Sequence, residues 1–302
     1  MEGKPSVRIL FIAKPATFHK HARPLVDAEG RIFLVLVGQP DRPSYRTAAA
    51  AVYDFIKTHG QAAAFPADMR RCRRGLFAAI NVGLTFGKGQ MLPTWLDNKE
   101  YTGLADQPLA NKDITRMATF ASASFKLWAP QLYDHYFQHN RKLASRFPHL
   151  HRPFPKSVFS CATSNFGRSV WTYRHRDICN LPFGLCTVQA LGNFDPKQGG
   201  HLVLWDLKLV IEFPAGALIL LPSATIPHSN IPVQEGDERV SFTQYTASGI
   251  FSFIDHGFRT QAELAAEDPI KYKQVMEEQE GRWKKGLSLF STLEDHLAHC
   301  AT

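Results

Sequence analysis

The sequence predicts an α+β fold in which helices cover a jelly roll or barrel of short β-strands. Short apolar or alternating runs recur between turn residues from Val158 to Ile254, at the spacing expected of an all-β core. Helical patterns flank this region on both sides. The 302-residue chain is 44% hydrophobic and 21% charged, which fits a folded protein with a sizeable core and excludes a mainly disordered one.

The first 150 residues are expected to support that core with paired strands and helices. Apolar, β-rich runs predict the strands, and apolar residues at helical spacing predict the helices. Gly60 is expected to end the first helix, and residues 61–109 show no regular period. We therefore expect strands at Val7–Ala13 and Ile32–Val37, and helices at Tyr45–His59, Asn111–Trp128 and Pro130–Ser145.

The β core is expected between residues 155 and 256. Turn residues such as Gly199-Gly200 separate its runs, and no internal repeat is present. The polar segment 260–302 predicts helices at Pro269–Lys285 and Leu287–His296, so 1–302 is expected to form one domain. The eight expected strands are Val158–Ala162, Val170–Arg174, Leu185–Ala190, His201–Trp205, Leu207–Phe213, Leu218–Leu221, Val240–Thr246 and Ile250–Ile254.

Several classes of protein are disfavoured by composition. No apolar run reaches the roughly 18 residues of a membrane span, and the first 14 residues predict no signal peptide. The five cysteines form no Cys-x-x-Cys pair, which argues against a disulfide framework or a structural zinc site and favours a reducing compartment. The net charge of +8 suggests an acidic partner such as nucleic acid, although many basic proteins bind none.

A dense basic run offers phosphate contacts. The run spans residues 70–74 and carries four guanidinium groups. The glycine-rich segment 83–90 adds one lysine, but its residue spacing is not that of a P-loop. A solvated loop or a nuclear-import signal explains the basic run equally well. The candidate phosphate contacts are Arg70, Arg71, Arg73, Arg74 and Lys88.

Two histidines and an aspartate form a candidate metal site. His175 and Asp177 follow a predicted strand, and residues i and i+2 of an extended segment point to the same face. His228 follows another predicted strand and a proline-rich turn. Two imidazoles and one carboxylate on one face of a metal leave three open positions, as in non-haem iron(II) oxygenases.

Arg239 and Ser241 support this interpretation more strongly than the His-x-Asp spacing itself. With 13 histidines and 27 acidic residues, about one His-x-(Asp/Glu) is expected by chance in this chain. Arg239 comes 11 residues after His228 on a run that alternates like a strand. Its guanidinium could grip a carboxylate with two hydrogen bonds, and the Ser241 hydroxyl could add a third. The alternative is a His228 that caps a turn and an Arg239 on the surface.

The motif order resembles that of the 2-oxoglutarate dioxygenases, which share a double-stranded β-helix. The stretch His175-Arg-Asp-Ile-Cys-Asn180, with Gly184-Leu-Cys-Thr187-Val188 after it, is similar to the TET/JBP group, whose members oxidise the methyl group of 5-methylcytosine or thymine. The segments Gly199–Asp206, Phe213–Pro222 and His228-Ser-Asn230 resemble the expanded fungal branch of that group. The resemblance covers roughly residues 80–256.

The resemblance implies roles for individual residues. His175, Asp177 and His228 would bind Fe(II), and Arg239 and Ser241 would bind 2-oxoglutarate, with O2 as co-substrate. Two further residues match the TET residues that contact a flipped base: Asn180 by a hydrogen bond and Tyr245 by stacking. Ala247 stands where animal TET enzymes have a base-contacting histidine, which leaves 5-methylcytosine, thymine and N6-methyladenine open as substrates.

The implied partner is double-stranded DNA with a methylated base flipped into the site, because iron cannot reach a base inside the duplex. We expect a monomeric nuclear enzyme that takes part in DNA demethylation. Two alternatives remain: the same chemistry on a protein side chain or small molecule, and an inactive module that binds nucleic acid. Asn180 and Tyr245 have structural alternatives too, as a turn asparagine and a core tyrosine.

Overall fold

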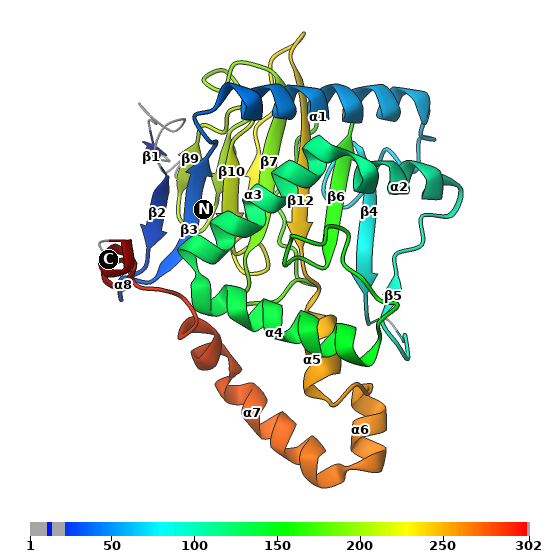
Figure 1. Ribbon diagram of the computed structural model, residues 1–302. Coiled ribbons are helices and arrows are strands. Elements are labelled where there is room, and N and C mark those ends of the chain that lie inside the picture. The colour runs from blue at the N-terminus through cyan, green and yellow to red at the C-terminus, as the bar shows by residue number, and fades with distance from the viewer. Residues whose placement is uncertain (1–10, 14–21, 88, 301–302) are drawn as a thin grey trace, which may run out of the picture.

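Two facing β-sheets and a layer of helices make up the molecule (Figure 1). The computed structural model describes residues 11–13, 22–87 and 89–300. Neighbouring strands of the large sheet are antiparallel throughout. In spatial order these strands are β2 (Arg23–Val26), β3 (Ile32–Gly38), β10 (Leu218–Leu221), β7 (Cys186–Asn193), β12 (Glu238–Tyr245), β6 (Cys161–Phe166), β4 (Ala78–Thr85) and β5 (Thr94–Trp95).

A smaller sheet lies opposite the central strands of the large one. Leucine, isoleucine and phenylalanine side chains from both sheets meet in a common apolar cluster between them. Its strands, in spatial order, are β1 (Phe11–Ala13), β9 (Leu209–Ile211), β8 (Leu202–Leu204) and β11 (His228–Asn230). This α+β arrangement of helices on a jelly-roll core confirms the predicted fold class.

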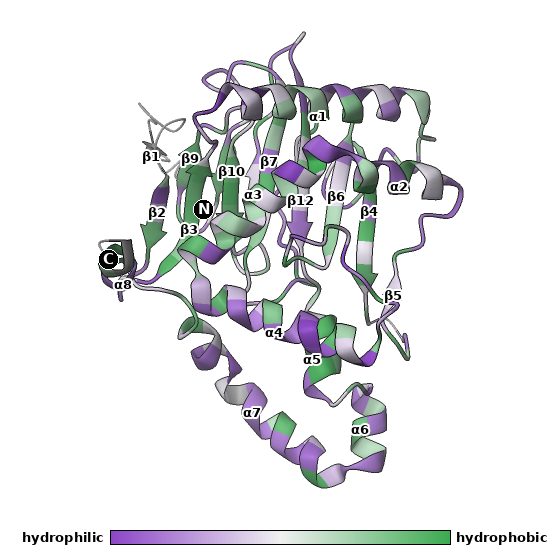
Figure 2. Cartoon of the chain, viewed as in Figure 1, coloured by the Kyte–Doolittle hydropathy of each residue, from purple (hydrophilic) through white to green (hydrophobic). Residues whose placement is uncertain are grey.

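Helices cover the other face of the large sheet (Figure 1). Apolar side chains of α1 and α3 pack against Val240 and Phe242 of β12, and Figure 2 shows hydrophobic residues along β3, β10 and β7. The helical segments are α1 (Pro43–Ala62), a 3-10 turn (Lys99–Tyr101), α2 (Thr102–Ala110), α3 (Lys112–Trp128), α4 (Pro130–Arg146), α5 (Ser248–Asp255), α6 (Gln261–Glu267), α7 (Pro269–Leu287) and α8 (Leu293–Cys300).

The alternation along β12 determines which side chains reach the space between the sheets. Val240 and Phe242 point towards the helices, so Arg239, Ser241 and Tyr245 point the other way. This is the face on which the sequence placed the candidate carboxylate-binding residues. None of the described helices is long and apolar enough to cross a membrane.

Several local expectations are wrong. The helix expected at Leu287–His296 begins only at Leu293, as α8, because residues 288–292 form a turn between α7 and α8. Residues 250–254 belong to helix α5 rather than to a strand, because Ile250, Phe253 and Ile254 recur at helical spacing and pack against Leu84 and Leu143. The predicted strand at 170–174 has no continuous ladder. Gly60 lies inside α1 instead of ending it. A glycine is needed there for packing, because a Cβ would come within 2.8 Å of the Phe166 ring.

The β core also extends beyond the expected range of 155–256. Strands β2, β3, β4 and β5 come from the N-terminal part of the chain and complete the large sheet, and β4 and β5 with α2 lie in the segment 61–109 that showed no period. Of the strand expected at Val7–Ala13, the structure describes the last three residues, which form β1. Residues 7–10 lie outside the described part of the chain. Helices α3 and α4 confirm their predictions, and the Asn111 side chain caps α3 by accepting from the backbone N–H groups of Asp113 and Ile114.

Candidate metal centre and co-substrate pocket

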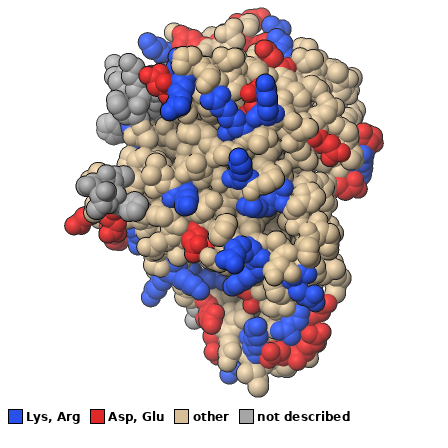
Figure 3. All heavy atoms as spheres, viewed as in Figure 1, with Lys and Arg blue, Asp and Glu red and all other residues tan. Residues whose placement is uncertain are grey.

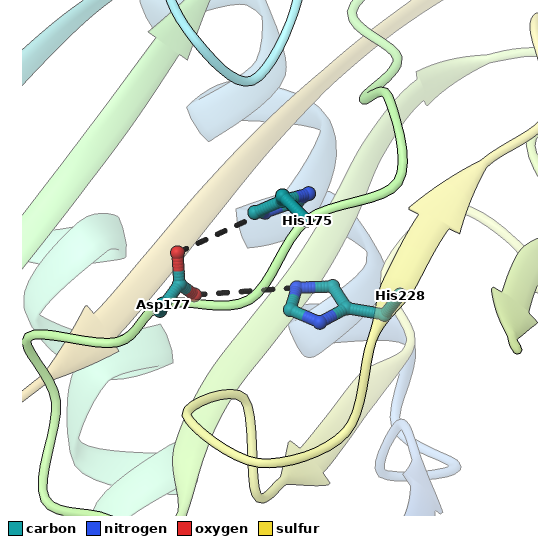
Figure 4. A group of neighbouring side chains, drawn as sticks. All are labelled: His175, Asp177 and His228. Carbon is teal, nitrogen blue, oxygen red and sulfur yellow. Dashed lines mark ion pairs between the residues drawn. The ribbon is translucent and has the colours of Figure 1, made fainter. Parts of the chain in front are cut away.

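His175, Asp177 and His228 converge between the two sheets (Figure 4). One ligand atom from each lies within 4.8 Å of the others. The His175 Nε2 is 3.7 Å from Asp177 Oδ1, and the His228 Nε2 is 4.0 Å from Asp177 Oδ2. Among the described residues, these form the only group of three or more His, Cys, Asp or Glu side chains with metal-binding geometry. The three candidate ligands named from the sequence therefore lie together.

The backbone orients both imidazoles. His175 and His228 exchange two backbone hydrogen bonds, of 3.0 and 2.9 Å, which bring β11 beside the segment that carries His175. The His175 Nδ1 lies 2.8 Å from the Tyr173 carbonyl, and the His228 Nδ1 lies 2.9 Å from the Ile226 carbonyl. Each Nδ1 is thus a donor, which leaves the Nε2 lone pair free to bind a metal.

The protonation state of this group suits a metal. Burial, assisted by the neighbouring His228, lowers the pKa of His175 to about 4, and burial also lowers the pKa of His228. Both imidazoles are therefore neutral near pH 7. Two neutral imidazoles and one carboxylate on one side, with the opposite side open to a cavity, fit a six-coordinate iron(II) site.

A cavity of about 320 Å³ opens beside the three ligands. Its wall on the large sheet carries polar side chains from three neighbouring strands, β4, β6 and β12, where a purely structural core would be apolar. The residues from these strands that line it are Asn81, Asn165, Ser241, Thr243 and Tyr245. Asn81, Asn165 and Thr243 were not singled out from the sequence; the only signal was their polar character within apolar β patterns.

Arg239 is the largest fully buried side chain among those described, with a relative exposure of 1%. Its Nη1 donates to the Val170 carbonyl at 2.6 Å, but its Nε and Nη2 have no hydrogen-bond partner. Burial lowers the pKa of Arg239 to about 10, so it keeps its charge at neutral pH. A buried, charged fork with unpaired donors fits an anionic ligand such as a carboxylate.

Ser241 extends this anion-binding face along β12. It lies two residues after Arg239 and points to the same side. The Asn165 Nδ2 donates to the Ser241 Oγ at 2.9 Å, and the Asn165 Oδ1 has no partner. The Ser241 hydroxyl hydrogen is thereby left free for a ligand. Arg239 and Ser241 together fit the distal carboxylate of 2-oxoglutarate.

The two predicted base-contacting residues line the same cavity. The Asn180 Nδ2 donates to the Ser223 Oγ at 3.1 Å, and its backbone pairs with Ala247. The Tyr245 hydroxyl is 3.4 Å from the Asn81 Oδ1, and burial raises the pKa of Tyr245, which keeps the phenol neutral. Asn180 and Tyr245 thus line one cavity, and Ala247 lies beside Asn180.

The candidate phosphate contacts separate into groups. Arg73 and Arg74 line the cavity beside the metal ligands, and the Arg73 Nη2 donates to the Arg176 carbonyl at 3.2 Å. Arg70 lines a different cavity and donates to the Phe65 carbonyl, and Arg71 is exposed. Lys88 lies outside the described residues. The structure thus places two of the five beside the site.

Basic side chains also occur far from this cavity. On the face that carries α1, α3 and α4, Lys and Arg side chains are spread widely, with acidic groups mainly towards the edges (Figure 3). The net charge of +8 is therefore shared among several surfaces. It does not by itself locate a binding site.

No protein-family model and no curated protein sequence matches the chain. Solved structures do match. The one described as NgTET1 in complex with 5mC DNA has a TM-score of 0.56 and 11% sequence identity, over 76% of this chain and 77% of that chain. A 2OG-Fe(II) oxygenase from Burkholderia pseudomallei has a TM-score of 0.37 and 15% identity, over 71% of this chain and 85% of that one. A Pseudomonas putida prolyl-4-hydroxylase has a TM-score of 0.34 and 16% identity, over 66% and 85%.

The likeness to NgTET1 concerns the fold. At 11% identity it shows that this chain has the same arrangement of sheets and helices as NgTET1, and the other two scores are too low to add to that conclusion. The site itself rests on residues of this chain. Its three potential metal ligands and its buried, partly unpaired guanidinium are carried by a jelly-roll fold, and a fold of this kind can serve many reactions.

Proposed function

We propose that the chain is an Fe(II)- and 2-oxoglutarate-dependent dioxygenase that oxidises the methyl group of 5-methylcytosine in DNA. One observation carries the proposal. The three-ligand group lines one cavity together with Ser241, and Arg239, two residues earlier on the same face of β12, is buried with two unpartnered donors. A metal alone would not require a buried guanidinium, and an anion alone would not require three convergent ligands.

The residues of this site would divide the work of binding. His175, Asp177 and His228 would hold the metal, while Arg239 and Ser241 would hold the distal carboxylate of the co-substrate. When bound, iron with 2-oxoglutarate and O2 supplies the oxidising power that converts a C–H bond to C–OH, with release of succinate and CO2. The protein contributes position and exclusion of water rather than acid–base groups.

The remaining cavity suits a planar base. Tyr245 offers a stacking surface, and the amides of Asn180 and Asn81 offer donors and acceptors to a base edge. The base must leave the duplex to reach a site between two sheets. The solved structure of similar fold, NgTET1, is a complex with 5mC DNA, which supports 5-methylcytosine over other bases. Thymine and N6-methyladenine are the alternative bases, because Ala247 supplies no polar group to that edge.

The arginines at the cavity favour nucleic acid over a protein side chain or a small molecule. Arg73 and Arg74 line the cavity, and their guanidinium groups could bind the backbone phosphates of a flipped nucleotide. An inactive binding module would have no need for an unpaired guanidinium in its core. The proposal includes a monomeric chain that acts on nuclear DNA and thereby contributes to demethylation.

A substrate comparison tests the proposal. The iron-loaded protein is incubated with 2-oxoglutarate and three matched duplexes that contain 5-methylcytosine, N6-methyladenine or no methylated base, and succinate and oxidised bases are measured by mass spectrometry. We expect hydroxymethylcytosine and succinate from the first duplex only. Succinate without any oxidised base would contradict the DNA substrate, and absence of succinate from every reaction would contradict the proposed enzyme class.

A further inference from the structure

An exposed isoleucine lies at the rim of the metal cavity. Ile178 follows Asp177 directly, lines the cavity, and is 74% exposed. The turn at 178–179 carries it, between two segments that the backbone fixes: the Asp177 N–H donates to the Ser223 carbonyl and the Ser248 N–H to the Cys179 carbonyl. A large apolar side chain is thus held in water beside the place where substrate must enter.

Guanidinium groups surround the same rim. Arg73 and Arg74 line the cavity with Ile178, and Arg174 and Arg176 flank His175 in sequence. The Arg73 Nη2 hydrogen bond to the Arg176 carbonyl links the two segments. The Asp206 carboxylate lies near two of these arginines, with its oxygens 3.7 Å from the Arg174 Nη2 and 3.9 Å from the Arg176 Nη2. The rim therefore has an excess of positive charge.

Half-exposed aromatic rings are interleaved with these charges. Trp205 is 39% exposed and lies under the Arg174 guanidinium, with 5.2 Å from its carbon to the ring centroid. Tyr173 is 42% exposed, and its backbone N–H donates to the Arg74 carbonyl at 2.8 Å. Guanidinium groups alternating with aromatic rings suit a polymer that presents phosphates and flat bases together.

We propose that Ile178 enters the DNA duplex and fills the gap that the extruded base leaves, while the arginines of the rim bind the flanking phosphates. This inference rests on the proposed function, because it requires a flipped base. Extrusion exposes the faces of the two neighbouring base pairs and of the orphaned partner base to water. An apolar wedge that covers those faces stabilises the open duplex, and a β-branched side chain with few rotamers loses little entropy in doing so.

The position of Ile178 suits this role better than a role in the core. Its neighbour Asp177 belongs to the candidate metal site, so a base held at a metal there would lie beside the residue that fills the gap it had left. The exposed side chain buries little apolar area within the protein. Its replacement should therefore leave folding intact, which makes the proposal open to a clean test.

The test compares Ile178→Ala with wild type on duplex and single-stranded DNA that contain the same 5-methylcytosine. Single-stranded DNA has no gap to fill. We expect kcat/KM on the duplex to fall about 10-fold or more, and kcat/KM on the single strand to change by less than about two-fold. Ile270→Ala is the matched control, because Ile270 is 76% exposed on α7 and lines none of the cavities described above.

A binding measurement separates the wedge from the chemistry. With 2-aminopurine beside the methylcytosine, fluorescence should rise when wild type or Ile270→Ala binds the duplex and unstacks it, and the rise should be lost in Ile178→Ala. Equal duplex activity in Ile178→Ala and wild type would overturn the wedge alone, as would equal loss on both substrates. If wild type oxidises neither DNA, the proposed function fails, and the wedge fails with it.

Discussion

The Asn165 amide donates a hydrogen bond of 2.9 Å to the Ser241 hydroxyl across the paired strands β6 and β12. This bond fixes the hydroxyl oxygen as an acceptor, so its hydrogen points elsewhere and is available to a ligand. The Asn165 Oδ1 is buried and has no partner among the described residues. Asn165 therefore positions Ser241, and both belong to the proposed binding face for the co-substrate.

Removal of this amide should weaken the co-substrate site without disturbing the metal. For Asn165→Ala we expect KM for 2-oxoglutarate to rise about 5- to 10-fold, the effect of one lost hydrogen bond, with less change in kcat. Steady-state kinetics at saturating DNA measures both. Asn140→Ala is a suitable control, because Asn140 also donates an amide hydrogen bond, to the Val158 carbonyl, but from α4. A similar rise of KM in the control would contradict the role of Asn165.

Arg239 should be needed for ligand binding rather than for folding. A buried charge with two unpaired donors destabilises the ligand-free protein, so Arg239→Met should leave the free energy of unfolding unchanged or raise it by up to about 4 kcal/mol. Thermal unfolding with Fe(II) under anaerobic conditions should show that 2-oxoglutarate raises the Tm of wild type but not of this variant.

The control for Arg239 is Arg152→Met. Arg152 is half-buried and donates to the carbonyls of Ser157 and Pro155, outside the metal cavity. It should keep the 2-oxoglutarate shift in Tm. If Arg239→Met instead unfolded in the absence of ligand while Arg152→Met did not, the guanidinium would be a structural element.

His135 should make the metal-free protein less stable in mild acid. Burial, with the charge of His139, lowers the pKa of His135 to about 4, from an ordinary value of 6.5. Between these values the unfolded chain binds a proton that the folded protein does not, so the free energy of unfolding falls as the pH drops from 6.5 to about 4. His135→Phe keeps a ring against Phe251, on which His135 stacks at 5.3 Å between centroids, and should reduce this slope.

Urea denaturation in the presence of a chelator, repeated across that pH range, measures the slope. His175 and His228 remain in both proteins, so their contributions cancel in the difference. The exposed His149 provides the control substitution, His149→Phe. An unchanged pH slope in His135→Phe would show that His135 does not titrate in this window.

Tyr245 should act on DNA and not on the cofactors. Loss of a base-stacking ring costs about 1–3 kcal/mol, so Tyr245→Ala should lower kcat/KM for methylated DNA about 5- to 150-fold. Tyr245→Phe keeps the ring, loses the hydroxyl with its long 3.4 Å contact to Asn81, and should stay close to wild type. Affinities for iron and 2-oxoglutarate, measured by anaerobic calorimetry, should not change. Equal loss of iron binding and DNA oxidation would instead mark a tyrosine of the core.

Local patterns predicted part of this molecule well. Asn111 before an apolar helical run located the start of α3, and the alternation of β12 placed Arg239 and Ser241 on one face. The separation of 11 residues along the chain between His228 and Arg239 supported His228 as a ligand of the candidate metal centre. No strand was expected at β11, which carries His228. These features depend on spacing along a single segment, which the sequence displays directly.

Features that depend on pairing between distant segments were missed. Asn81 and Asn165 reach the cavity only because β4 pairs with β6 and β6 with β12, and the sequence of β4 alone gave no usable period. Short apolar runs are also ambiguous, which explains the strand expected in place of α5. Gly60 was expected to end a helix, but its glycine has another role: the missing side chain leaves room for the Phe166 ring.

The coupling of succinate release to base oxidation tests the central claim most directly. Wild type and Asp177→Ala are compared in parallel reactions with Fe(II), 2-oxoglutarate and a duplex that contains 5-methylcytosine. Asp206→Ala is the control, because it also removes a carboxylate, one that pairs with Arg174 on the rim. We expect wild type and Asp206→Ala to bind iron and to release one succinate for each oxidation of the methyl group, and Asp177→Ala to do neither. Iron binding and coupled turnover in Asp177→Ala would contradict the assigned metal centre.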